Sequence, residues 1–151
     1  MNWNLGSLRR DHGRFLAAHS AMVGGVLYDV GNVAVAEVAL HPGFTPRSGD
    51  LQKATKPRVV RTRNGRILRV ANAKPYARAI EEGSKPHKIA ARVGKALRFI
   101  GSGGIVFRRA VNHPGNKPYW FLRSAMGVAG TRAESMLHAG MQRVSRSSFG
   151  R

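Results

Sequence analysis

Apolar residues recur at steps of three and four over residues 11–40, which predicts one long amphipathic helix. His41-Pro42-Gly43 follows and predicts its end, because proline cannot continue a helix. Glycines at positions 24, 25 and 31 each weaken a helix by roughly 1 kcal/mol relative to alanine, and they indicate a bend or a close helix contact. We interpret this helix as one that faces the core, in preference to a membrane or partner-binding helix.

The rest of the chain predicts two hairpins and a second helix. In Arg58–Asn72, apolar and basic residues flank Asn64-Gly65, a strong signal for a two-residue turn, which would place Arg63 opposite Arg66. A second hairpin is predicted over residues 96–111, with its turn in the glycine-rich residues 101–104, and helical spacing returns over residues 119–144. The sequence therefore predicts an α+β fold. An antiparallel sheet built from two β-hairpins would be packed by a long N-terminal helix and a C-terminal helix.

With 151 residues, the chain is long enough for one domain that buries about 70% of its unfolded surface. We expect residues 1–10 to be a flexible arm and residues 146–151 a flexible tail. Between them, residues 11–145 are expected to form a single α+β domain, from which the hairpin 58–72 projects.

Charge changes this picture most. Lysine and arginine number 26 against 7 acidic residues, a net charge of +19, which favours polyanions or carboxylate-rich protein surfaces as partners. No lysine or arginine lies in residues 15–46, whereas the first hairpin is rich in them. Its candidate docking or DNA-facing residues are Arg58, Arg61, Arg63, Arg66 and Arg69. An equally open interpretation is a solvated hairpin whose charges only prevent edge aggregation.

Composition also bears on compartment. The chain has no cysteine, and therefore no disulfide, thiolate metal site or cysteine nucleophile. No apolar run approaches the roughly 20 residues that span a bilayer, and the N-terminal sequence lacks a signal-peptide apolar region. We expect a soluble, non-secreted protein that does not bind membranes.

Catalytic patterns are weak. The six histidines have no metal-type spacing, and the adjacent Glu81 and Glu82 would point to opposite faces of a strand. A basic nuclease using His87 or His113 with Glu82 has no nucleophile or metal pattern to support it. Aromatic residues between positions 76 and 121 could stack on bases, but their apolar neighbours favour core packing. We expect no enzyme activity, no catalytic or metal-binding residue and no cofactor.

A series of short motifs resembles the head–tail joining (neck, or tail-completion) proteins of long-tailed bacteriophages. No single motif is strong, but their order and spacing over about residues 11–140 are fairly specific. The motifs are Thr45-Pro46, Ser48–Leu51, Tyr76-Ala77, Glu81 or Glu82 before Gly83, Lys85-Pro86-His87, Ala96–Phe99, Val106-Phe107, His113-Pro114-Gly115 and Leu122-Arg123-x-Ala125.

The resemblance implies a structural virion protein that is made in the host cytoplasm and lies in the neck between head and tail. It would form a homo-oligomeric ring that contacts portal or connector-side proteins and tail terminator or tail tube proteins, with possible contact to DNA in the channel. It implies a shaping turn at Gly83 and at His113, Pro114 and Gly115, and sheet anchors at Tyr76 and Phe99. The alternative is a monomeric basic nucleic-acid-binding protein, ribosome-like or nucleoid-like, whose affinity falls steeply with salt.

Overall fold

The computed structural model describes residues 5–92, 94–101 and 103–149. Contacts divide the chain into two compact units, where the sequence predicted a single domain. The first unit joins the residues up to Lys74 with those from Phe121 onward, and the second is Pro75–Trp120.

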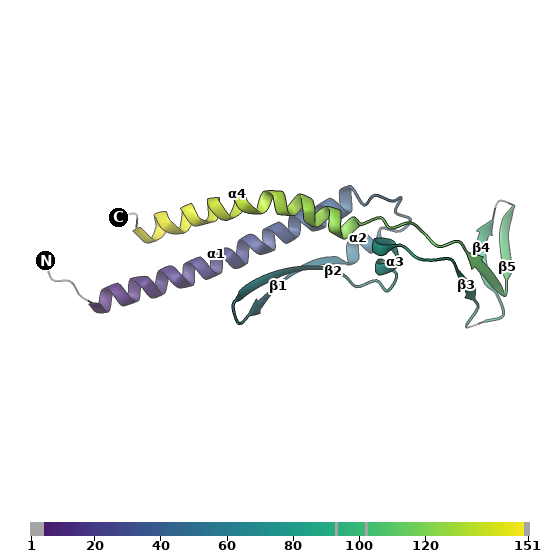
Figure 1. Cartoon of the computed structure of the whole chain (residues 1–151), viewed down its shortest axis with the longest axis horizontal. Coiled ribbons are helices and arrows are strands. Elements are labelled where there is room, and N and C mark those ends of the chain that lie inside the picture. Colours follow the sequence, from purple (N-terminus) through teal and green to yellow (C-terminus); the bar gives the residue numbers. More distant parts are fainter. Residues whose placement is uncertain (1–4, 93, 102, 150–151) are drawn as a thin grey trace. The chain divides into compact units, whose positions relative to one another are not determined.

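Two long helices form the body of the first unit. They are α1 (Leu5–Leu40) and α4 (Phe121–Phe149), which run in opposite directions (Figure 1). Apolar side chains are buried on one face of each helix, and most of them are small or β-branched, which lets the two backbones approach closely. The buried positions are Val26, Val30, Ala34 and Val38 on α1, and Phe121, Ala125 and Ala129 on α4. Both predicted helices are confirmed.

The ends of α1 follow the sequence signals only in part. The helix ends at Leu40, directly before His41-Pro42-Gly43 as predicted, and the His41 amide still donates to the Glu37 carbonyl at 2.8 Å. At the other end, residues 5–10 belong to α1 instead of the expected flexible arm, and residues 146–149 belong to α4 instead of the expected tail. Residues 1–4 and 150–151 of those two segments lie outside the described residues.

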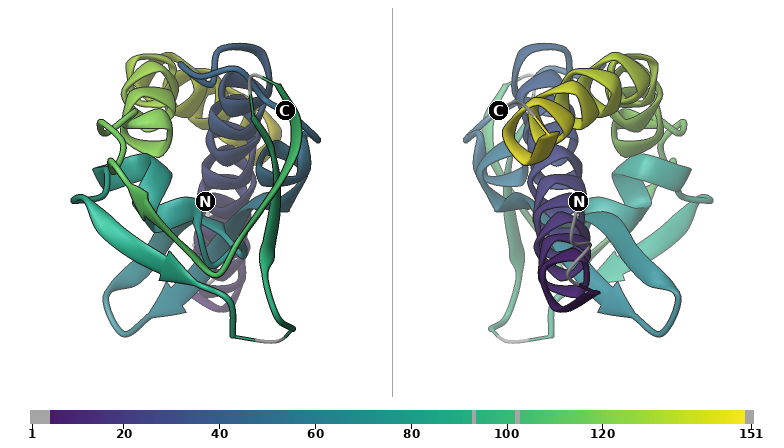
Figure 2. Two further views of the ribbon diagram at one scale, coloured as in Figure 1. Left: turned by 90° about the vertical axis from the view of Figure 1, so that its right-hand side faces the viewer. Right: turned by 90° about the vertical axis from the view of Figure 1, so that its left-hand side faces the viewer.

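A hairpin of β1 (Thr55–Thr62) and β2 (Gly65–Asn72) packs on another side of α1 than α4 does (Figures 1 and 2). Alternate side chains face the helix, among them Pro57 and Leu68, which both contact the helix at Gly31. A Cβ atom at Gly31 would lie 2.5 Å from Pro57 Cβ and 2.8 Å from Leu68 Cδ1. The hairpin therefore lies along α1, and the prediction that it projects from the domain is wrong.

The register of this hairpin differs from the predicted one by two residues. Thr62 pairs with Gly65 and Arg61 with Arg66, so Arg63 and Asn64 form the turn. Gly65 begins β2 with φ 146°, so the glycine serves the first strand position instead of the turn centre. A shift of two residues keeps each side chain on its predicted face.

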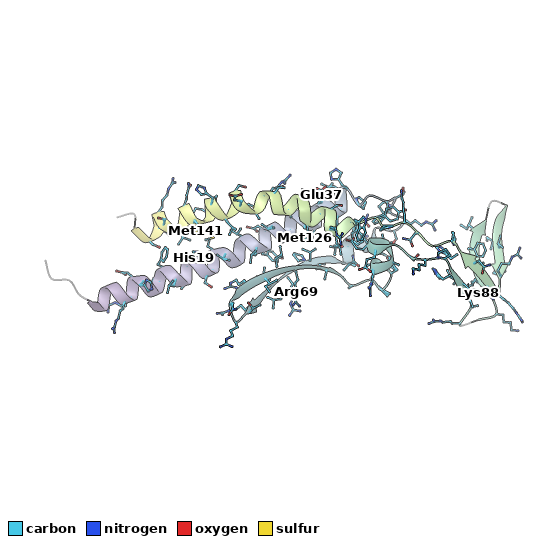
Figure 3. All side chains as sticks on the ribbon, in the orientation of Figure 1. His19, Glu37, Arg69, Lys88, Met126 and Met141 are labelled. Atoms are coloured by element: carbon cyan, nitrogen blue, oxygen red, sulfur yellow. The ribbon has the colours of Figure 1, made fainter. Side chains whose placement is uncertain are left out.

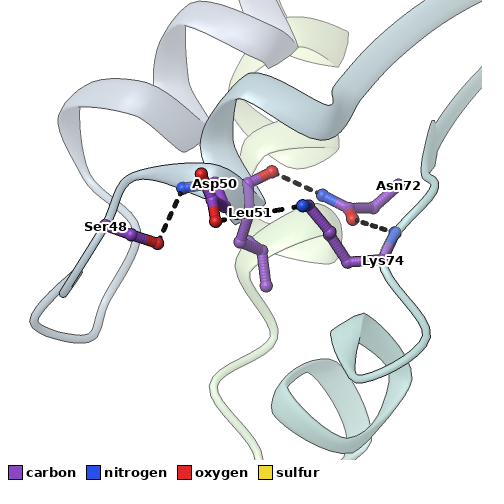
Figure 4. A network of polar contacts seen from close by, with 5 residues as sticks. All are labelled: Ser48, Asp50, Leu51, Asn72 and Lys74. Atoms are coloured by element: carbon purple, nitrogen blue, oxygen red, sulfur yellow. Dashed lines mark hydrogen bonds and ion pairs between the residues drawn. The ribbon is translucent and has the colours of Figure 1, made fainter.

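The observed register is held at the base of the hairpin by a polar network. Asn72 Nδ2 donates to Thr55 Oγ1 at 2.7 Å and to the carbonyl of Leu51 at 2.6 Å, in the short helix α2 (Asp50–Ala54). Thr55, which is fully buried, donates to the same carbonyl at 3.0 Å. Lys74 closes the network through its amide, which donates to Asn72, and its ammonium, which lies 3.9 Å from an Asp50 carboxylate oxygen (Figure 4). These bonds require Thr55 opposite Asn72.

The second unit contains α3 (Ala77–Glu82) and four short strands. The strands are β3 (His87–Ala90), β4 (Leu97–Gly101), β5 (Gly104–Arg108) and β6 (Ala110–His113). β4 pairs with β5 as the predicted second hairpin, while β6 leaves it and pairs antiparallel with β3. The α+β class with antiparallel hairpins and two long helices is confirmed. The strands of the described residues form three two-stranded sheets instead of one continuous sheet.

Candidate interaction surfaces

A clasp in the second unit brings together two of the predicted turn residues. Ser84 and Asn116 exchange backbone hydrogen bonds at 2.9 and 3.1 Å, and Asn116 Nδ2 donates to the Ala79 carbonyl at 2.8 Å. Gly83 (φ 80°) and Gly115 (φ 82°) flank this bridge. A Cβ atom on Gly115 would collide with the Ser84 carbonyl oxygen, and one on Gly83 would lie 2.8 Å from the Asn116 carbonyl oxygen.

His113 and Pro114 complete the same turn. His113 ends β6, opposite His87 at the start of β3, and its Nδ1 accepts a hydrogen bond from the Gly115 amide at 3.0 Å. That bond fixes the direction in which the chain leaves β6. His113 therefore stabilises the turn at residues 113–115 through this hydrogen bond.

Of the two predicted sheet anchors, one lies in a strand and the other does not. Tyr76 precedes α3, lies outside every described strand and is 44% exposed. Phe99 does lie in β4, opposite Val106, but it is 40% exposed because the β4–β5 sheet has only two strands. Neither side chain is buried, so the core packing expected of these two aromatic residues is not observed. The expectation of core packing holds for Phe121 of the first unit, which is buried.

The β4–β5 hairpin carries an exposed apolar face that was not predicted from the sequence. Ile100 pairs with Ile105, and Phe107 pairs with Arg98, so all four side chains lie on one face. Ile100 is 84% exposed and Phe107 is 60% exposed. Within the described residues, β4 and β5 pair only with each other. An isolated two-stranded hairpin is marginally stable in water, and exposed apolar patches mark interaction sites.

The arginines of the first hairpin separate into two groups. Arg66 faces α1: its Nη2 donates to Ser20 Oγ at 3.2 Å, and its guanidinium covers Gly24. Arg58 and Arg69 lie opposite each other on the outer face, and Figure 3 shows Arg69 on the side of the hairpin away from α1. Arg61 lies opposite Arg66 near the turn, and Arg63 lies in the turn. Arg61 and Arg63 are exposed. The structure thus assigns Arg66 a packing role and leaves the other four exposed.

Titratable groups elsewhere are dispersed. In the described part of the chain, no three histidine, cysteine or acidic side chains gather where they could hold a metal ion. Glu82, the acidic residue of the hypothetical nuclease site with His87 or His113, accepts a hydrogen bond from Arg78 Nε at 2.7 Å. This bond and the charge of Glu82 raise the pKa of the Arg78 guanidinium.

One segment of α1, Arg9–Leu40, is long and apolar enough to cross a membrane by length and composition. The prediction that no apolar segment is long enough to span a bilayer is therefore wrong. In the first unit, however, this helix packs on α4 and on the β1–β2 hairpin, and the arginine at position 66 lies against it. A spanning helix would have to leave both contacts, so the packing favours a core helix.

No protein-family model, curated protein or solved structure matches the chain. The resemblance to phage neck proteins therefore stays a prediction from the sequence motifs. The geometry adds two surfaces whose chemistry calls for partners: the apolar face of β4–β5 and the basic outer face of β1–β2.

Proposed function

We propose that this chain is a non-enzymatic structural subunit of the bacteriophage neck, which forms a ring joining the DNA-filled head to the tail. The motif series from residues 11 to 140 supports the family. The observation that carries the proposal is the exposed apolar hairpin β4–β5, because a monomer gains nothing from presenting Ile100, Ile105 and Phe107 to water. In a ring, a neighbouring copy would cover this face.

Self-association of so basic a chain should depend on salt in a characteristic way. At low salt the net charge of +19 opposes association of two copies, and salt screens that repulsion without weakening apolar contacts. Assembly of copies should therefore strengthen as salt rises. Binding to nucleic acid would show the opposite trend, because it releases counterions.

Analytical ultracentrifugation of the purified protein over a salt series tests the proposal, together with the double variant Ile100→Ser/Ile105→Ser. Partial burial of the two isoleucines is worth roughly 3 kcal/mol per interface, so the variant should associate on the order of a hundredfold more weakly. Leu40→Ser, which alters an equally exposed apolar residue at the end of α1, is the matched control and should assemble like the wild type. A wild-type protein that stays monomeric at every salt concentration would sink the proposal.

The second candidate is a monomeric basic nucleic-acid-binding protein, and the exposed arginines of β1–β2 favour it specifically. A protein of that kind would shift duplex DNA at physiological salt as a monomer, and the shift would weaken steeply with added salt. The Ile100→Ser/Ile105→Ser variant would then bind DNA as the wild type does.

A further inference from the structure

The outer face of the β1–β2 hairpin combines charge with apolar surface. Along this face, Lys56 lies opposite Ala71, Arg58 opposite Arg69 and Val60 opposite Ile67. Ile67 is 47% exposed, although β-branched residues in a two-sided hairpin commonly face the packed side. We call these residues the outer basic face: Lys56, Arg58, Val60, Ile67, Arg69 and Ala71.

The cations of this face have no acidic partner in the part of the chain that the structure describes. Arg58 and Arg69 are directly opposite, an arrangement of like charges that destabilises a sheet. Residues 55–72 contain no acidic residue. The ion pairs of the described residues involve none of the cations of this face. The inner Arg66, by contrast, is bonded to α1. An arrangement that opposes folding and lacks an internal counter-ion is best relieved by an external anion.

The apolar pair of Val60 and Ile67 indicates whether the anion belongs to a nucleic acid or to a protein. A phosphate backbone is held by charge and hydrogen bonds, and it has no use for an exposed isoleucine beside the arginines. Protein interfaces, in contrast, combine a water-excluded apolar centre with arginine, which is enriched at their energetic hot spots. The Val60–Ile67 pair beside Arg58 and Arg69 has that composition.

A second copy of this chain has few carboxylates to offer this face. Four of the seven acidic residues already have a basic partner within the chain. These pairs are Asp11 with Arg14, Glu37 with His41, Asp50 with Lys74 and Glu82 with Arg78. With 7 acidic residues against 26 basic ones, a second copy is a poor source of clustered carboxylates, so we take the partner to be a different protein.

We propose that the outer basic face docks onto an acidic protein surface in which carboxylates surround an apolar patch. This inference rests on the proposed function, because such a surface would belong to a neighbouring ring of the neck. The contact is distinct from the β4–β5 face, which would join copies of this chain to one another.

Arg58→Glu is the decisive variant, because it separates binding from folding. The introduced carboxylate lies opposite Arg69, so it replaces a like-charge pair by an ion pair and should raise the melting temperature. Binding is measured by fluorescence anisotropy to three probes: a peptide in which glutamate alternates with valine, the same peptide with serine for valine, and duplex DNA. The expected result for the glutamate–valine peptide is at least about tenfold weaker binding to Arg58→Glu and to Ile67→Ser. The matched control, Arg132→Glu on the exposed side of α4, should bind this peptide within about twofold of the wild type.

Three results would overturn the inference. The first is that Arg132→Glu and Arg58→Glu weaken binding of the glutamate–valine peptide equally, and the second is that the wild type binds the serine peptide as tightly as the valine peptide. The third is that the wild type binds duplex DNA more tightly than either peptide and that Ile67→Ser leaves this DNA binding unchanged. Sedimentation of the same samples keeps the two proposals apart. A wild type that assembles while Arg58→Glu still binds the peptide normally contradicts only this inference. A wild type that never assembles contradicts the proposed ring.

Discussion

Alanine at Gly31 should destabilise the protein, although alanine is the better helix former. An added Cβ would lie 2.5 Å from Pro57 Cβ and 2.8 Å from Leu68 Cδ1, whereas carbon atoms in contact prefer about 3.5–4.0 Å. The β1–β2 hairpin would have to withdraw by roughly 1 Å, which forfeits a large part of its dispersion contacts with α1. This overpacking should lower the free energy of unfolding by about 2 kcal/mol, whereas the higher helix propensity of alanine should raise it by about 1 kcal/mol.

Gly25 provides the matched control on the same helix. It is exposed, and nothing lies within 4 Å of the Cβ that alanine would add. Gly25→Ala should therefore raise the free energy of unfolding by about 1 kcal/mol, and Gly31→Ala should lower it by about 1 kcal/mol. Urea unfolding followed by circular dichroism measures both, and an unchanged m-value shows that the unfolded states are comparable. If both variants are stabilised equally, the hairpin does not lie against α1, and the packing described for the first unit is refuted.

Further predictions concern the clasp and the base of the first hairpin. Gly115→Ala should lower the free energy of unfolding by at least about 3 kcal/mol, because alanine would be strained at φ 82° and its Cβ would collide with a backbone oxygen. The control Gly94→Ala, at φ 95° in open space, should lower it by only about 1 kcal/mol. Hydrogen exchange of the β3 and β6 amides reads out both, and equal protection in the two variants would contradict the clasp. Thr55→Val should lower the free energy of unfolding by about 1–3 kcal/mol, because Asn72 loses a buried hydrogen-bond acceptor. Thermal melting measures this change. An unchanged melting temperature would show that the network does not hold the register.

The local signals in the sequence predicted most of the elements. Helical spacing located α1 and α4, the His-Pro-Gly sequence ended α1 at Leu40, and Asn64-Gly65 located the first hairpin. The register was missed by two residues because it depends on a side-chain network: the bond between Asn72 and Thr55 holds residues far apart in the sequence. A turn motif alone does not encode such a contact.

The tertiary arrangement was the harder part. The sequence predicted that the first hairpin projects, because arginines lie on both of its faces. The structure packs it on α1, with Gly31 giving Pro57 and Leu68 room and Arg66 bonded to Ser20. Glycines within a helix were the available signal, but they do not say whether a helix or a hairpin approaches.

The candidate surfaces were predicted in part. The basic residues of the first hairpin were identified from charge, whereas their division into one inward and four exposed arginines needed the observed pairing and packing. The apolar face of β4–β5 was not predicted: of its residues, only the aromatic Phe107 was expected in the core, because its neighbours in the sequence are apolar. Only the pairing of strands shows that Ile100 and Phe107 belong to a sheet of two strands without such a layer.

Electron microscopy of the purified protein at high salt tests the central claim most directly. The account predicts closed rings with a central channel, which are lost in the Ile100→Ser/Ile105→Ser variant and kept in Leu40→Ser. Isolated monomers under all conditions, accompanied by salt-sensitive binding of duplex DNA, would contradict the ring and establish the nucleic-acid-binding alternative.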